Sequence, residues 1–283
     1  MSLVVDAHHH FWDPARHHYY WMTDNVAAIR RHFGPEDLRP LLAPSGVDWT
    51  LVVQTISSMD ETREFLRIAD ETEFVAGVIG WVDLTHSSVA KALSELRSET
   101  GGHYLVGIRH QVHDEHDEEW LLDKHVQRGI QAVGEAGLVY DLLVRTRELP
   151  AALEVARALP QVRFVIDHMA KPRIANGPAD HEWELAMAPF SDLPNVMCKL
   201  SGMVTEAIPT EWTPEDLVPY VRRTLGWFGA ERCIFGSDWP VCLLAGTYGQ
   251  VVEALRYAVS DLKPADQEAI FGGNAVRVYG LPV

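Results

Sequence analysis

Short apolar runs alternate with longer amphipathic stretches along the whole chain. The apolar runs lie at 3–8, 49–54, 74–82, 104–110, 138–143, 162–168, 195–200 and 232–237. Most of them are continuously apolar, which is typical of parallel strands that are covered on both faces. Between them, apolar residues recur with the period of a helix, for example at 60–71, 88–99, 119–136, 148–158 and 250–260. The proline-rich segment 203–220 predicts a long loop that leads into a helix at Pro214.

This strict alternation of strand and helix predicts an α/β fold built from βαβ units. Eight such units within 283 residues indicate a (β/α)8 TIM barrel, and we expect one domain over 1–283. An open, doubly wound parallel sheet is the alternative. The glycine-rich phosphate loop GxGxxG that commonly follows the first strand of such sheets does not occur here.

Composition narrows the classes of partner. Lys+Arg is 24 and Asp+Glu is 40, so the net charge is 24 − 40 = −16. A chain this acidic repels phosphate backbones, which argues against nucleic acid and anionic membranes as partners. The 3 cysteines form no CxxC pair, and we expect them to be buried reduced thiols. No signal peptide pattern and no apolar run of about 18 residues is visible, so we expect a cytoplasmic monomer or small homo-oligomer.

Polar residues collect at the predicted strand ends, where TIM barrels place their catalytic groups. In chain order they are His8 and His10, Gln54, Trp81, Arg109 and His110, Asp141, His168, Lys199, and Asp238. Because side chains alternate along a strand, His8 and His10 should share one side and His9 the other. The same argument turns Asp167 away from His168. The pattern therefore predicts a histidine-rich site at the mouth of the barrel.

These residue types suit the activation of a water molecule. Three imidazoles (His8, His10 and His168) and the Asp238 carboxylate can hold one divalent cation with an open coordination position. Without a metal, Asp238 can act as general base while the histidines stabilise an oxyanion. The spacing alone leaves both possibilities open. No GxSxG nucleophile elbow, catalytic-cysteine signature or Walker loop occurs in the chain.

Six segments in fixed order carry a family resemblance. They are DAHHHFWD at 6–13, PEDLRPLL at 35–42, VGIRHQV at 106–112, VIDHMAKP at 165–172, NVMCKLSGM at 195–203 and CIFGSDWPVC at 233–242. Together they resemble the amidohydrolase superfamily, in its lactonase branch. That branch holds L-fuconolactone and L-rhamnonolactone hydrolases and 2-pyrone-4,6-dicarboxylate lactonase.

The resemblance implies a TIM barrel that hydrolyses a sugar lactone. It implies a centre of His8, His10, His168 and Asp238, with Asp238 as the base, and substrate contact by Arg109. Many superfamily members bridge two metals with a carboxylated lysine on the fourth or fifth strand. No lysine occurs in either predicted strand. We therefore expect one divalent metal, with zinc favoured, or none.

A neutral aldonolactone suits the strand-end residues better than a dicarboxylate does. The predicted substrate-binding residues are Gln54, Trp81, Arg109, His110, Asp141 and Lys199. They include no tight arginine cluster for a pyrone dicarboxylate. A metal-dependent decarboxylase and a sugar-acid-binding protein without turnover are further alternatives. The aromatic loop 17–22 either packs against a sugar ring and closes the site or plugs the barrel rim.

Overall fold

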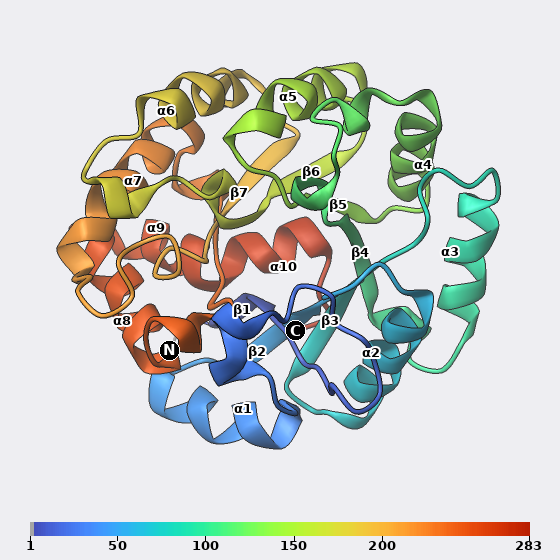
Figure 1. The fold of residues 1–283 in the computed structure, drawn as a ribbon, viewed down its shortest axis with the longest axis horizontal. Coiled ribbons are helices and arrows are strands. Elements are labelled where there is room, and N and C mark those ends of the chain that lie inside the picture. Colours follow the sequence, from blue (N-terminus) through green and yellow to red (C-terminus); the bar gives the residue numbers. More distant parts are fainter. Residues whose placement is uncertain (1–2) are drawn as a thin grey trace.

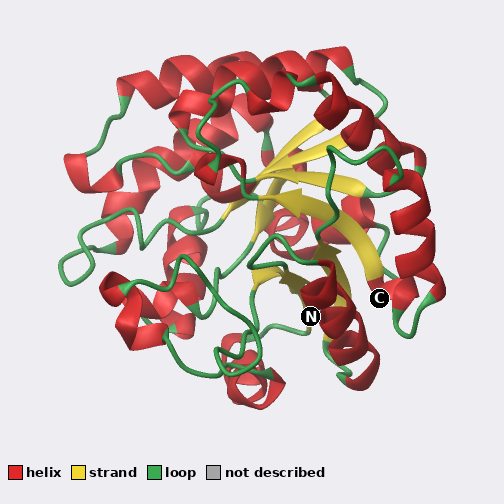
Figure 2. Cartoon of the chain, turned by 45° about the vertical axis from the view of Figure 1, so that its right-hand side comes forward, coloured by secondary structure: helices red, strands yellow, loops and turns green. Residues whose placement is uncertain are grey.

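The computed structural model describes residues 3–283, which form a ring of eight parallel strands inside a ring of helices (Figures 1 and 2). The strands are β1 (Val5–His9), β2 (Trp49–Val53), β3 (Val75–Gly80), β4 (Leu105–His110), β5 (Val139–Leu142), β6 (Arg163–Ile166), β7 (Val196–Leu200) and β8 (Cys233–Phe235). Each strand pairs in parallel with the next along the chain. The predicted (β/α)8 TIM barrel is therefore confirmed.

All helices but α10 form the outer layer, as Figure 2 shows by colour. The helices are α1 (Pro35–Leu42), α2 (Met59–Glu71), α3 (Val89–Ser98), α4 (Lys124–Glu135), α5 (Leu149–Ala158), α6 (His181–Met187), α7 (Pro214–Phe228), α8 (Tyr248–Ala258), α9 (Pro264–Glu268) and α10 (Asn274–Tyr279). Among residues 3–283, no helix combines the length and the apolar character needed to cross a membrane.

Most predicted elements overlap observed ones, and the differences lie at the ends. The stretch predicted as a helix over 119–136 divides into a 3-10 turn at Trp120–Leu122 and helix α4 from Lys124, where the Asp123 carboxylate caps α4 by accepting from the backbone N of His125 at 2.6 Å. Strands β6 and β8 end at Ile166 and Phe235, earlier than predicted. The alternation of strand and helix predicts a helix where α6 lies, and the sequence pattern gives no bounds for α6, α9 or α10.

The barrel interior is apolar below and charged above. Its apolar layer comes from the strands, with Val5, Leu51, Val139, Val165 and Ile234 among its buried members. Helix α10 crosses the centre of the ring in Figure 1 and closes the apolar end with Val278 and Tyr279. Asn274 at its start donates its side-chain N–H to the backbone oxygen of Cys233 at 2.8 Å, at the beginning of β8. The floor of the barrel is thus a helix anchored to the strand starts.

The seam between β1 and β8 closes the ring. The backbone N of His10 donates to Trp239 O at 2.7 Å, and that of Asp238 donates to His8 O at 2.7 Å. Asp6 reinforces this seam from a fully buried position. Its carboxylate accepts from Ser237 N at 2.8 Å, Ser237 Oγ at 2.6 Å and Tyr248 OH at 3.1 Å. Closure therefore depends on one buried carboxylate as well as on the backbone.

Replacing Asp6 tests this reading of the seam. We expect Asp6→Ala to lower the free energy of unfolding by about 3 kcal/mol, because it leaves the buried Ser237 and Tyr248 hydroxyls without their acceptor. Urea unfolding monitored by circular dichroism measures the change. Asp48→Ala is the matched control, since it removes one exposed hydrogen bond from Val4 N on the same strand. Equal losses in the two variants would contradict a special role for Asp6.

Candidate active site

Three imidazoles surround one carboxylate oxygen at the mouth of the barrel. Asp238 Oδ1 lies 3.3 Å from His10 Nε2, 3.8 Å from His8 Nε2 and 3.9 Å from His168 Nε2. All four side chains are buried. The cavity above them has a volume of about 250 Å³, and its lining includes His10, Arg109, His168 and Asp238. The structure thus brings together the four residues that the sequence predicts as the centre.

A bulge in β1 aims His8 and His10 at this centre. Asp6 pairs with Thr50, but His9 pairs with Val52, so β1 gains one residue over β2. His9 points away and bonds Thr50 Oγ1 through Nε2 at 2.9 Å. The His10 ring is fixed by its Nδ1, which lies 2.8 Å from Val53 O and must donate to it. His10 Nε2 is left to face Asp238 Oδ1, which lies 3.3 Å away.

The side chains that follow β6 are oriented differently from the prediction. Val165 faces the barrel interior whereas Ile166 packs in the outer layer, so simple alternation would turn His168 outward. Left-handed backbone at His168 (φ 53°) instead returns its ring to within 4.4 Å of the His8 ring centroid. The prediction that Asp167 turns away from the site is wrong. Its carboxylate lies 3.3 Å from His8 Nδ1.

Asp167 belongs to a buried ion network beneath the centre. It contacts Arg109 Nη1 at 3.0 Å and Lys199 Nζ at 3.1 Å. Lys199 also donates to Asp141 at 2.5 Å, and Asp141 accepts from Tyr279 OH at 2.9 Å. Burial alone raises the pKa of a carboxyl group, but Lys199, His8 and Arg109 together hold the pKa of Asp167 well below its usual range. Asp167 is thus an anion between two cations.

Burial and charge also set the protonation of the centre. Burial lowers the pKa of His8 well below its usual value and that of His168 to about 3. Burial would raise the pKa of Asp238, but the surrounding His168, His10 and His8 lower it by more. Near neutral pH the centre therefore holds an ionised Asp238 beside neutral His8 and His168, the protonation state in which both residue types bind a metal or accept a proton.

The predicted substrate-binding residues occupy three kinds of place. Arg109 lines the cavity, and its guanidinium lies 3.1 Å from His8 Nε2. The other predicted polar residues on β2, β5 and β7 (Gln54, Asp141 and Lys199) are completely buried below the cavity. Trp81 and His110 pair with each other at 3.0 Å outside the lining.

Sequence reasoning missed several polar lining residues, among them Thr55, Gln111, His113, Asp114 and Arg145. Gln111 shares strand parity with Arg109 and lies just past β4, which is the signal that would have found it. The aromatic loop 17–22 contributes to both the core and the cavity. Tyr19 is 5% exposed and packs under the rim, whereas Trp21 lines the cavity.

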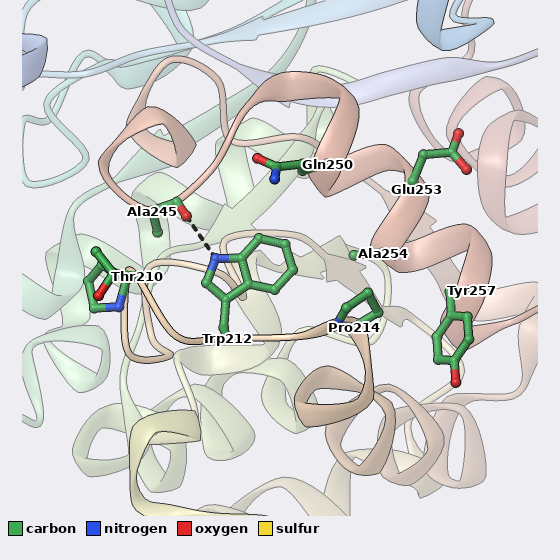
Figure 3. Close-up of a pocket in the computed structure, with 9 residues that line it drawn as sticks. Thr210, Trp212, Pro214, Ala245, Gln250, Glu253, Ala254 and Tyr257 are labelled. Carbon is green, nitrogen blue, oxygen red and sulfur yellow. Dashed lines mark hydrogen bonds between the residues drawn. The ribbon is translucent and has the colours of Figure 1, made fainter.

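A second hollow lies on the outside of the barrel, between the loop before α7 and helix α8 (Figure 3). Trp212 forms one wall, and its Nε1 donates to Ala245 O at 2.7 Å. Glu253 and Tyr257 come from α8. None of the four residues of the histidine–aspartate centre lines this hollow, so the chemistry belongs to the cavity at the barrel mouth.

Comparisons with known proteins agree with this geometry. The profile of the amidohydrolase family (Amidohydro_2) matches residues 5–281. The chain belongs to the amidohydrolase family. It is 43% identical over 288 residues to an L-fucono-1,5-lactonase of Burkholderia ambifaria, covering 99% of this chain and 97% of that protein. It is 34% identical to an L-fucono-1,5-lactonase of Burkholderia multivorans, covering 99% and 97% of the two chains.

A crystal structure of a Burkholderia multivorans amidohydrolase with bound zinc has the same architecture. Its TM-score to this chain is 0.93 at 34% identity, with 99% of this chain and 100% of that chain covered. In the present amidohydrolase, ligand atoms of His8, His10 and Asp238 all lie within 4.8 Å of one another. Imidazole nitrogen and carboxylate oxygen are common ligands of divalent metals. The donor set therefore fits one cation.

Gly236 gives the centre its room. A Cβ at this position would lie 2.6 Å from His8 Cβ. We expect Gly236→Ala to destabilise the amidohydrolase by about 1–3 kcal/mol through overpacking. Gly226→Ala, on α7 with no atom within 4 Å, should be neutral or stabilising. Urea unfolding measures the change in the free energy of unfolding for each variant. Stabilisation by both substitutions would refute the argument that a Cβ at Gly236 crowds His8.

Proposed function

We propose that this amidohydrolase is a lactonase that opens a sugar lactone, with L-fucono-1,5-lactone as the nearest model substrate. The observation that carries the proposal is the buried His8, His10, His168 and Asp238 cluster at the cavity floor. The two lactonase relatives, matched over nearly their full length, support the choice of substrate.

Asp238 starts the reaction in this mechanism. Its carboxylate takes a proton from water, and the resulting hydroxide adds to the lactone carbonyl carbon. The guanidinium of Arg109, which lines the cavity, stabilises the tetrahedral oxyanion. The oxyanion collapses, the ring C–O bond breaks, and Asp238 returns the proton to the alkoxide. The product is an open-chain sugar acid, which releases one proton to solvent near neutral pH.

We further propose that His8, His10 and Asp238 hold zinc. Bound there, the ion would supply a Lewis acid that polarises the carbonyl oxygen and lowers the pKa of nearby water. The zinc in the Burkholderia multivorans relative and the clustered ligand atoms support this choice. The chain's own residues keep the roles already given, with Asp238 accepting the proton.

Removing the base tests the mechanism. We expect Asp238→Asn to lower turnover of L-fucono-1,5-lactone by at least about 10²-fold, because the amide cannot accept a proton. A pH-indicator assay follows the acid product. Asp24→Asn serves as the control, since its side chain is 96% exposed and does not line the cavity. Near-normal turnover in Asp238→Asn would remove Asp238 from the role of base.

Metal removal tests the zinc proposal separately. Isothermal titration of the metal-free chain should show one zinc bound per chain, and His10→Asn should weaken that binding by about 10-fold or more. Exhaustive chelation should lower lactonase turnover, and added zinc should restore it. Full turnover without any metal would refute the zinc proposal while leaving Asp238 as the base.

A further inference from the structure

We infer that Trp21 and Gln111 form one wall of the cavity, and that this wall recognises the sugar ring and its hydroxyls. The two residues thereby determine specificity for hydroxylated lactones. This inference rests on the proposed function, because the ligand it names is the substrate of that same site. Both residues line the cavity above the histidine–aspartate centre. They reach it from distant parts of the chain, the loop after β1 and the end of β4.

One backbone oxygen holds both side chains. Thr55 O accepts from Trp21 Nε1 at 3.0 Å and from Gln111 Nε2 at 2.7 Å. Thr55 itself is fixed by the buried carboxylate of Glu61 on α2, which accepts from Thr55 N at 2.8 Å and Ile56 N at 3.2 Å. The indole plane and the amide therefore have a common rigid support that takes no part in the proposed chemistry.

The orientation of the Gln111 amide follows from this contact. Reversing the amide would place two oxygens 2.7 Å apart, so the nitrogen must face Thr55. Gln111 is 6% exposed, and its Oε1 has no hydrogen-bond partner among the residues that the structure describes. An acceptor buried without a donor costs free energy. The inference requires a rotation about the broad terminal torsion of Gln that exposes Oε1 to the cavity, where a ligand hydroxyl would supply the missing donor.

Trp21 provides the apolar half of the wall. Its ring packs edge-on against Trp12, with centroids 5.2 Å apart. This packing and the bond to Thr55 O fix the ring. Val241 and Leu244 also line the cavity. A flat aromatic face suits the C–H face of a sugar ring, whereas the amide oxygen accepts only from a donor such as a hydroxyl. A carboxylate substituent has no proton to give there, so the wall favours neutral polyhydroxy lactones.

A comparison of two lactone substrates separates recognition of the sugar hydroxyls from the hydrolysis step itself. L-fucono-1,5-lactone carries hydroxyls, and δ-valerolactone has the same ring size without them. We expect Gln111→Met to lower kcat/KM for the sugar lactone by about 3- to 10-fold, the effect of one neutral hydrogen bond. Trp21→Leu should lower it by about 10-fold, mainly through KM. For δ-valerolactone, Gln111→Met should leave kcat/KM unchanged within about 2-fold, and Trp21→Leu should affect it less than it affects the sugar lactone.

The chain offers a matched control for each variant. Trp212→Leu removes a tryptophan whose Nε1 also donates to a backbone oxygen, that of Ala245 (Figure 3). Gln127→Met removes an amide that donates to Leu122 O at 3.3 Å. Neither control should change the ratio of the two kcat/KM values. Equal losses on both lactones in the Trp21 and Gln111 variants, or no loss on either, would overturn the inference.

Calorimetry with the open-chain sugar acid distinguishes this inference from the proposed function. Suppose that the unmodified chain hydrolyses neither lactone but binds the sugar acid, and that Trp21→Leu weakens this binding. The lactonase proposal is then refuted, whereas the role of the wall in sugar recognition is supported. If the chain hydrolyses both lactones and the variants keep the normal ratio, only the wall fails. If the chain neither hydrolyses nor binds, both fail.

Discussion

The buried charge of Lys199 is the constraint on which the site depends. Its side chain is completely buried, and an unpaired ammonium there would cost several kcal/mol. Asp141 at 2.5 Å and Asp167 at 3.1 Å balance it. Asp167 in turn holds Arg109, so the side chains of strands β4 to β7 are bound into one compensated cluster. A cluster of this kind keeps its members in place because moving any one of them leaves another charge unpaired.

This cluster links the floor of the barrel to its mouth. Tyr279 on α10 donates to Asp141 from below, and Lys199 and Asp167 both contact His8 Nδ1 from above that point, at 3.4 Å and 3.3 Å. The ring of His8 is therefore oriented by a path that begins on the terminal helix. Fixed ligands around a reactive centre avoid the cost of ordering them during the reaction.

Periodicity predicted the barrel because each strand is covered on both faces, so its apolar run is continuous and visible. Parity placed His8, His10 and His9 on the correct sides, but the structure achieves this through a bulge that alternation from the start of β1 does not contain. At Asp167 and His168 the same reasoning failed. Residues 168–171 all adopt left-handed backbone, with φ between 52° and 58°. Non-glycine residues rarely adopt this conformation, and no local sequence signal announces it.

The cavity combines two supports of different origin. The histidine–aspartate centre is held by the buried ion cluster of Arg109, Asp141, Asp167 and Lys199. Because these charges compensate one another, replacing any one of them leaves another unpaired. Trp21 and Gln111 rest on the carbonyl of Thr55, which Glu61 holds from α2. Loops at the carboxyl ends of barrel strands vary without disturbing the strands themselves. A change in the loop that carries Trp21 can therefore alter the specificity for lactones, while the ion cluster and the water-activating centre keep their geometry.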